Sequence, residues 1–171
     1  MTRDEAGLGM LMFNEMLEQP KVLANAILRW DAEITDICAV LPEKIQGVVF
    51  VARGSSDNAA TIGRYAVEAF AGIPASLAAP SLSTRYTPHA SYENYLIIAM
   101  SQSGGTPEVV AVASALKGRG SKIIAITNSS DSSLSRIADL HLGLAAGPEQ
   151  AVPATKTVTA QVLAVLKIAS A

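Results

Sequence analysis

The chain has 171 residues, of which 50% are hydrophobic and 16% are charged, and its formal net charge is -2. This composition is typical of one globular domain, and the absence of any basic run argues against a nucleic-acid partner. The longest apolar runs, residues 47–52 and 95–100, are far too short to cross a bilayer, so no membrane partner is expected. Cys38 is the only cysteine, which excludes an internal disulfide and a cysteine-based metal cluster and fits a cytoplasmic location.

The predicted elements begin with helices and continue with strands and helices in alternation. Residues 7–37 carry apolar side chains at helical spacing, interrupted at Pro20. Short apolar runs predict strands at residues 47–52, 75–79, 95–101, 122–128 and 140–145. Helical patterns lie between and after them, at residues 57–71, 106–120, 132–140 and 153–171. Asp57 is expected to cap the first of these helices.

This alternation predicts an α/β fold in three layers. A five-stranded parallel sheet of flavodoxin-like order 2-1-3-4-5 would carry helices on both faces, since continuous apolar strands are buried on both sides. The expected organisation is a helical arm over residues 1–45, followed by a domain over residues 46–171. No internal repeat is present.

Two loops rich in hydroxyl groups and glycine follow the first and third predicted strands. They read "RGSSDN" (53–58) and "SQSGGTPE" (101–108). In the order 2-1-3-4-5 the chain reverses direction across the sheet between these strands, and ligands bind at such a switch point. In the second loop, Thr106 is expected to cap a helix that starts at Pro107, after a tight turn through Gly104 and Gly105.

The second loop has the features of a phosphate site without a lysine. A helix N-terminus directs free N–H groups and the positive end of its dipole toward the loop. Polar donors are added by Ser101, Gln102, Ser103 and Thr106. The loop matches neither the nucleoside-triphosphate nor the dinucleotide glycine motif. In the first loop Gly54 allows the turn, while Ser55 and Ser56 can reach a sugar or a phosphate edge. The alternative is that both loops only form turns and cap helices.

Four ordered motifs together resemble the sugar isomerase (SIS) domain family. They are "GSSDNAA", "SQSGGT", "ITNSSDSSLSRIADL" and "AGPEQAVPATKTVTAQ", and the resemblance runs from about residue 12 to the C-terminus. It is greatest for the isomerase module of glutamine–fructose-6-phosphate aminotransferase and its deaminase-like relatives. The resemblance implies a site for a sugar phosphate such as fructose 6-phosphate or glucosamine 6-phosphate. The residues that it implies are Ser101, Gln102, Ser103 and Thr106 for the phosphate, Gly54, Ser55 and Ser56 for the sugar, and Val152 in a loop closing over the sugar.

The resemblance also implies aldose–ketose isomerisation or amino-sugar-phosphate deamination, with no metal or organic cofactor. Gly105 stands where the aminotransferases carry an acidic residue, and Ala154 stands where they carry a hydroxyl group, which favours a stand-alone isomerase or deaminase. Family members of this type have two tandem SIS domains, the catalytic groups come from the second copy and the C-terminal tail, and this chain matches the first copy. No catalytic residue can therefore be carried over.

Two local candidates for chemistry remain open. Glu149 could act as a base or simply cap the last helix, and Lys156 could meet a ligand, pair with Glu149 or form another structural ion pair. A non-catalytic sugar-phosphate sensor is the alternative function. A homodimer is expected, because groups missing from one copy must come from another and the apolar N-terminal helices offer a surface to bury.

Overall fold

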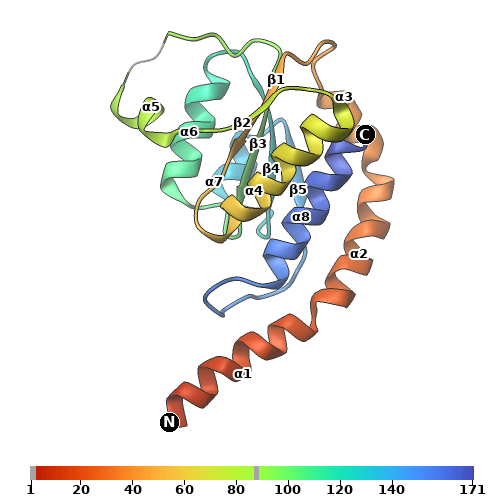
Figure 1. Ribbon diagram of the computed structural model, residues 1–171, viewed down its shortest axis with the longest axis vertical. Coiled ribbons are helices and arrows are strands. Elements are labelled where there is room, and N and C mark those ends of the chain that lie inside the picture. Colours follow the sequence, from red (N-terminus) through yellow and green to blue (C-terminus); the bar gives the residue numbers. More distant parts are fainter. Residues whose placement is uncertain (1–2, 87–88) are drawn as a thin grey trace.

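Five parallel strands form the centre of the computed structural model, which describes residues 3–86 and 89–171 (Figure 1). Three helices come first: α1 (Arg3–Leu17), α2 (Gln19–Ala32) and α3 (Ile34–Val40). The strands are β1 (Gly47–Val51), β2 (Ala75–Leu77), β3 (Tyr95–Ser101), β4 (Lys122–Thr127) and β5 (Leu140–Gly143). The helices between and after them are α4 (Ser55–Ala66), α5 (Pro80–Arg85), α6 (Pro107–Lys117), α7 (Ser133–Ile137) and α8 (Lys156–Ala169), and a π-helical turn, η1 (Val67–Ala71), extends α4.

The strand order β2-β1-β3-β4-β5 confirms the predicted flavodoxin-like sheet. Every neighbouring pair is parallel, and Val48 of β1 pairs with Ala75 on one side and Leu96 on the other. Because the strands are parallel, their carboxyl ends and the loops after them share one edge of the sheet. The loops after β1 and β3, which are neighbours in the sheet, are therefore adjacent.

Alternate side chains of the strands fill two separate apolar layers. Phe50, Ile98 and Ile126 pack with α2, α4 and α8, around the fully buried Trp30. Side chains on the opposite face pack with α6 and α7. Figure 1 shows the same arrangement, with α4 and α8 on one side of the sheet and α6 on the other. The prediction of helices on both faces is confirmed.

Two local predictions needed correction. Asp57 does not cap α4; Gly54 is the capping residue, and Asp57 lies in the first turn. Gly54 has a φ of +63°, a conformation open to glycine, so the chain turns directly from the strand into the helix two residues earlier than expected. Pro20 does not end the first helix but lies in the first turn of α2, where its missing N–H group costs nothing.

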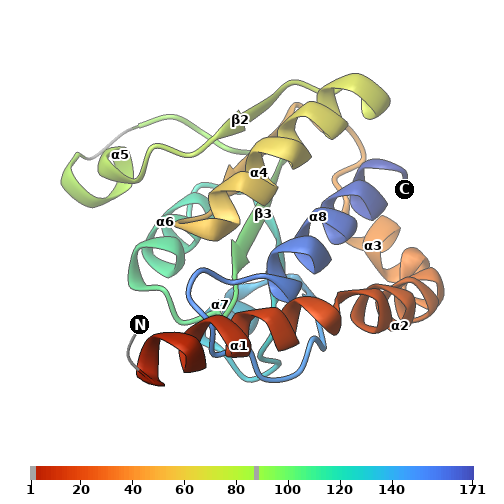
Figure 2. The same ribbon diagram turned by 60° about the horizontal axis from the view of Figure 1, so that its bottom comes forward.

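Helix α1 projects away from the sheet, whereas α2 and α3 contact α8 and β5. Figure 2 shows α1 passing in front of the loop that leads into α8, and α2 packs against α8. None of the helices in residues 3–86 and 89–171 combines the length and the apolar character needed to cross a bilayer.

Candidate functional site

The loops after β1 and β3 enclose a pocket of about 180 Å³ at the carboxyl edge of the sheet. Its lining consists of Arg53, Ser55, Ser56, Ser101, Gln102, Ser103, Thr106, Ala154, Thr157 and Val158. Six of the eight residues predicted to bind substrate are in this set. The other two, Gly54 and Val152, do not line the pocket, and Val152 is 90% exposed.

The loop after β3 is closed by its own hydroxyl groups. Ser101 Oγ lies 2.9 Å from Thr106 Oγ1 and accepts a hydrogen bond of 3.2 Å from the Gly104 amide. Thr106 stands at the N-cap of α6 and Pro107 at its first position, as predicted, but the Thr106 side chain does not cap the helix. Its hydroxyl group bonds to Ser101 instead. The first N–H groups of α6 therefore keep their capacity to meet a ligand.

Helix α7 supports this loop from behind. Gly104 has a φ of +67°, and a Cβ atom there would lie 2.3 Å from Ser132 Oγ. The Gly104 carbonyl accepts a hydrogen bond of 3.0 Å from the Leu134 amide. Ser132 is held in turn by a capping box with Ser135. Glycine is thus required at position 104 both by its backbone angle and by the close approach of α7.

Arg53 is a lining residue that the sequence did not single out as part of the site. It lies two residues after the end of β1, at the switch point of the sheet, and this position was the signal that the sequence offered. Its Nε atom lies 2.9 Å from Glu108 Oε2, and its Nη1 atom lies 3.9 Å from Asp57 Oδ2. The pocket therefore combines one guanidinium group with serine and threonine hydroxyls.

Glu149 holds the start of α8 and does not line the pocket. Its carboxylate accepts hydrogen bonds from the Thr155 amide at 2.7 Å, the Thr155 hydroxyl at 3.0 Å and the Thr157 amide at 3.3 Å, and also from the Thr157 hydroxyl. Burial raises the pKa of Glu149, but the hydrogen bonds from Thr157 and Thr155 outweigh it, so the pKa lies below its usual value. This geometry favours the helix-capping interpretation, since an ionised, fully hydrogen-bonded carboxylate is a weak base.

Lys156 is also turned away from the pocket. It is 1% exposed, and its Nζ atom lies 2.7 Å from Glu18 Oε2 at the junction of α1 and α2. Lys156 therefore forms a structural ion pair with Glu18, and it neither pairs with Glu149 nor lines the pocket. Among the side chains that the structure describes, no group of three or more from His, Cys, Asp or Glu is placed to hold a metal ion.

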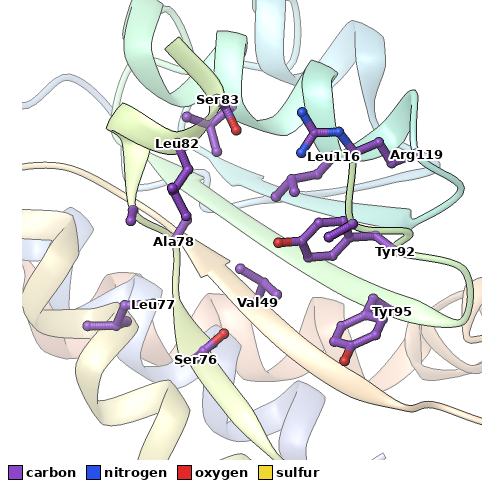
Figure 3. A pocket seen from close by; sticks show the side chains of 13 residues that line it. Val49, Ser76, Leu77, Ala78, Leu82, Ser83, Tyr92, Tyr95, Leu116 and Arg119 are labelled. Carbon is purple, nitrogen blue, oxygen red and sulfur yellow. The ribbon is translucent and has the colours of Figure 1, made fainter. Parts of the chain in front are cut away.

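A second pocket, of about 370 Å³, lies elsewhere on the molecule (Figure 3). It lies between β2, the short helix α5 and α6, and its polar lining comes from Ser76, Ser83, Tyr92, Tyr95 and Arg119. Tyr95 begins β3, so this pocket reaches toward the amino end of the strand, whereas the candidate site lies at its carboxyl end. The two pockets share no residue.

The family model for the SIS domain matches residues 43–171. The chain belongs to the SIS domain family. Glutamine–fructose-6-phosphate aminotransferase from Caldanaerobacter subterraneus is 36% identical over 173 residues, which cover 97% of this chain and 28% of that protein. The corresponding enzyme from Pyrococcus horikoshii is 33% identical over 167 residues, with the same coverage. The SIS chain thus spans just over a quarter of these curated relatives.

Solved SIS structures share the fold. A candidate phosphosugar isomerase from Silicibacter pomeroyi superposes with a TM-score of 0.87 at 31% identity, over 93% of this chain and 49% of that one. The C-terminal domain of glucosamine-fructose-6-phosphate aminotransferase from Francisella tularensis superposes with a TM-score of 0.80 at 28% identity, over 93% and 46% of the two chains. The SIS chain is therefore homologous to one part of the isomerase module of these aminotransferases.

Proposed function

We propose that the pocket binds the phosphate and sugar of a phosphorylated sugar such as fructose 6-phosphate or glucosamine 6-phosphate. The observation that carries the proposal is the convergence of three hydroxyl groups, from Ser101, Ser103 and Thr106, with the N-terminus of α6 at one pocket. Neutral hydroxyl donors and free helix N–H groups are a recurring way of binding phosphate. The names of the relatives, which are phosphosugar enzymes, support the same class of ligand.

The proposed roles follow from position. Ser101, Gln102, Ser103 and Thr106 hold the phosphate, and Ser55 and Ser56 contact the sugar; all six line the pocket. Gly54 sets the turn that brings the serines there, and Val152 belongs to the loop proposed to close over the sugar when it binds. Arg53 joins this set as a cation beside the anionic ligand.

The proposed reaction is aldose–ketose isomerisation or amino-sugar-phosphate deamination. Isomerisation needs a base that moves a proton between C1 and C2. Among the described residues that line the pocket there is no Asp, Glu, His or Lys side chain. We therefore propose that this domain is the binding half of the catalytic unit, the first of a tandem pair, and that the base comes from a second SIS domain or another subunit.

Association and location belong to the same proposal. Met10, Phe13, Met16 and Leu17 of α1 are each about half exposed or more, and a homodimer would bury such side chains. A cytoplasmic location fits both the metabolic relatives and the single free cysteine, Cys38.

Calorimetric titration with fructose 6-phosphate, glucosamine 6-phosphate and inorganic phosphate tests the proposal. Ser103→Ala should weaken binding of the sugar phosphates by about 1–3 kcal/mol, the usual cost of losing a hydrogen bond to a charged group. Arg119→Ala, in the second pocket, is the matched control and should leave binding unchanged.

NMR of each mixture over time then distinguishes conversion of the sugar phosphate from binding alone. Binding without conversion would indicate a sensor or half of a site. Equal binding by wild type and Ser103→Ala would contradict the proposal.

A further inference from the structure

The N-terminal helices contact the segment from Gly143, the last residue of β5, to Lys156, the first residue of α8, at three points. At its start, the Gly143 carbonyl accepts hydrogen bonds from Trp30 Nε1, at 3.3 Å, and from Arg29. In its middle, Glu15 binds two consecutive backbone amides. At its end, Lys156 pairs with Glu18. None of these side chains lines the candidate site, but the segment that they hold does.

Glu15 makes the most specific of these contacts. Its Oε1 atom accepts a hydrogen bond of 2.7 Å from the Gln150 amide, and its Oε2 atom accepts one of 3.1 Å from the Ala151 amide. The residue is only 4% exposed. A buried carboxylate is costly unless both oxygens are hydrogen-bonded, so the energy of this group depends on the loop remaining where it is. The loop is correspondingly fixed by a helix some 135 residues earlier in the chain.

The held segment leads directly into the pocket wall. Ala154 lines the pocket three residues after Ala151, and Thr157 lines it one residue after the buried Lys156. Glu15 and Glu18 therefore fix this wall from both ends. The rest of the lining at residues 101–106 is supported separately, by its own hydroxyl groups and by the hydrogen bond from the Leu134 amide of α7 to the Gly104 carbonyl.

We infer that Glu15 is a positioning residue for the segment from Gln150 to Ala154, which carries Val152 and which the proposed function, on which this inference rests, places over the sugar. Its carboxylate sets the distance between the wall formed by Ala154 and Thr157 and the phosphate-binding loop. The phosphate-binding loop has its own support. Loss of the Glu15 carboxylate should therefore affect sugar binding and phosphate binding differently. Binding of the sugar part should weaken, while binding of phosphate alone should persist.

The test compares Glu15→Gln with Asp36→Asn, which removes one carboxylate charge from an exposed position on α3 of the same arm. Glutamine offers one acceptor oxygen and points an NH₂ group toward the second amide, so one buried donor is left unpaired. We expect Glu15→Gln to weaken fructose 6-phosphate binding at least about fivefold and to leave the Kd of inorganic phosphate within about twofold. Asp36→Asn should change neither value.

Hydrogen exchange supplies a readout that needs no ligand, and its wild-type measurement does not depend on the variant folding. In the wild-type protein the Gln150 and Ala151 amides should exchange slowly, and in Glu15→Gln they should exchange faster than the amides of β3. Fast exchange of both amides in the wild type overturns the inference. So does an equal change, or no change, in the two ligand affinities of Glu15→Gln. If the wild type binds neither ligand, the proposed function fails and this role fails with it, whereas intact ligand binding with unprotected amides removes this inference alone.

Discussion

Ser101 Oγ and Thr106 Oγ1 lie 2.9 Å apart, so the two ends of the loop after β3 are joined by side chains before any ligand binds. Ser101 Oγ also accepts the Gly104 amide. If Thr106 donates to Ser101, the Ser101 proton is left free to donate to a ligand, since each hydroxyl group has one proton and two acceptor positions. A loop ordered in this way loses little conformational entropy on binding an anion.

Gly104→Ala should destabilise the protein, because alanine at this position would combine a φ of +67° with a contact of 2.3 Å to Ser132 Oγ. We expect a loss of roughly 1–3 kcal/mol in the free energy of unfolding, measured with urea. Gly105→Ala is the matched control: the nearest atom to its Cβ would be Ser103 Oγ at 3.8 Å, so its stability should stay close to wild type. Equal stability of the two variants would contradict the support of this loop by α7.

Removing Glu18 should destabilise the protein more than removing the charge of its partner, Lys156. Glu18→Ala leaves a buried ammonium group without its carboxylate, and we expect a loss of roughly 1–3 kcal/mol, moderated because the Glu18 side chain is 54% exposed. Lys156→Met keeps the volume and removes the charge, so it should cost less. The double variant should recover part of the Glu18→Ala loss in a double-mutant cycle.

The Lys167–Asp31 pair, whose Asp31 side chain is 55% exposed, provides the comparison. Asp31→Ala should cost at most about 1 kcal/mol, the usual value for a surface pair. If Glu18→Ala is no more damaging than Asp31→Ala, the pair at Lys156 does not hold the N-terminal helices to α8.

The stability of the protein should fall as the pH drops below about 6.5, through His141. Burial lowers the pKa of His141 most, and the charge of Arg29 lowers it too, while the hydrogen bond with Thr127 and the charge of Glu33 raise it, and the net pKa lies below its usual value. As the pH falls, His141 is therefore protonated in the unfolded chain before it is protonated in the folded protein. Neutral His141 favours the folded state above its unfolded pKa, and this contribution is lost as the pH falls toward its folded pKa. Urea unfolding at pH 7.5 and 5.5 should show a smaller loss for His141→Asn than for wild type. His89→Asn, at an exposed loop position, should keep the wild-type loss.

The sheet could be predicted from the sequence because its strands are buried on both faces. β3 (Tyr95–Ser101) matches its apolar run at both ends, since every residue after Tyr95 is buried. The six-residue helix α5 (Pro80–Arg85) was missed, because its sequence carries no apolar periodicity and none of its residues is buried. The π-helical turn Val67–Ala71 was predicted only as helix, since a change of hydrogen-bond spacing leaves the side-chain pattern nearly unaltered.

The pocket could be predicted for a related reason. Parallel strands place the residues after β1 and β3 at one edge, so two local motifs were enough to locate six lining residues. The contacts of Glu15 and Lys156 could not be found in this way. Both join residues more than 130 positions apart, and each charge looks in the sequence like an ordinary polar position on an amphipathic helix.

Two-dimensional NMR of the ¹⁵N-labelled chain, titrated with fructose 6-phosphate, tests the location of the site most directly. If the pocket binds a sugar phosphate, the amide signals of residues 54–57, 101–106 and 108 should shift together and saturate, while those of Tyr92 and Arg119 at the second pocket should stay in place. Inorganic phosphate should shift the signals of residues 101–106 and 108 and leave those of residues 54–57 nearly unmoved. Saturable shifts confined to the second pocket, or no shifts at millimolar ligand, would contradict the assignment of this pocket to a phosphorylated sugar.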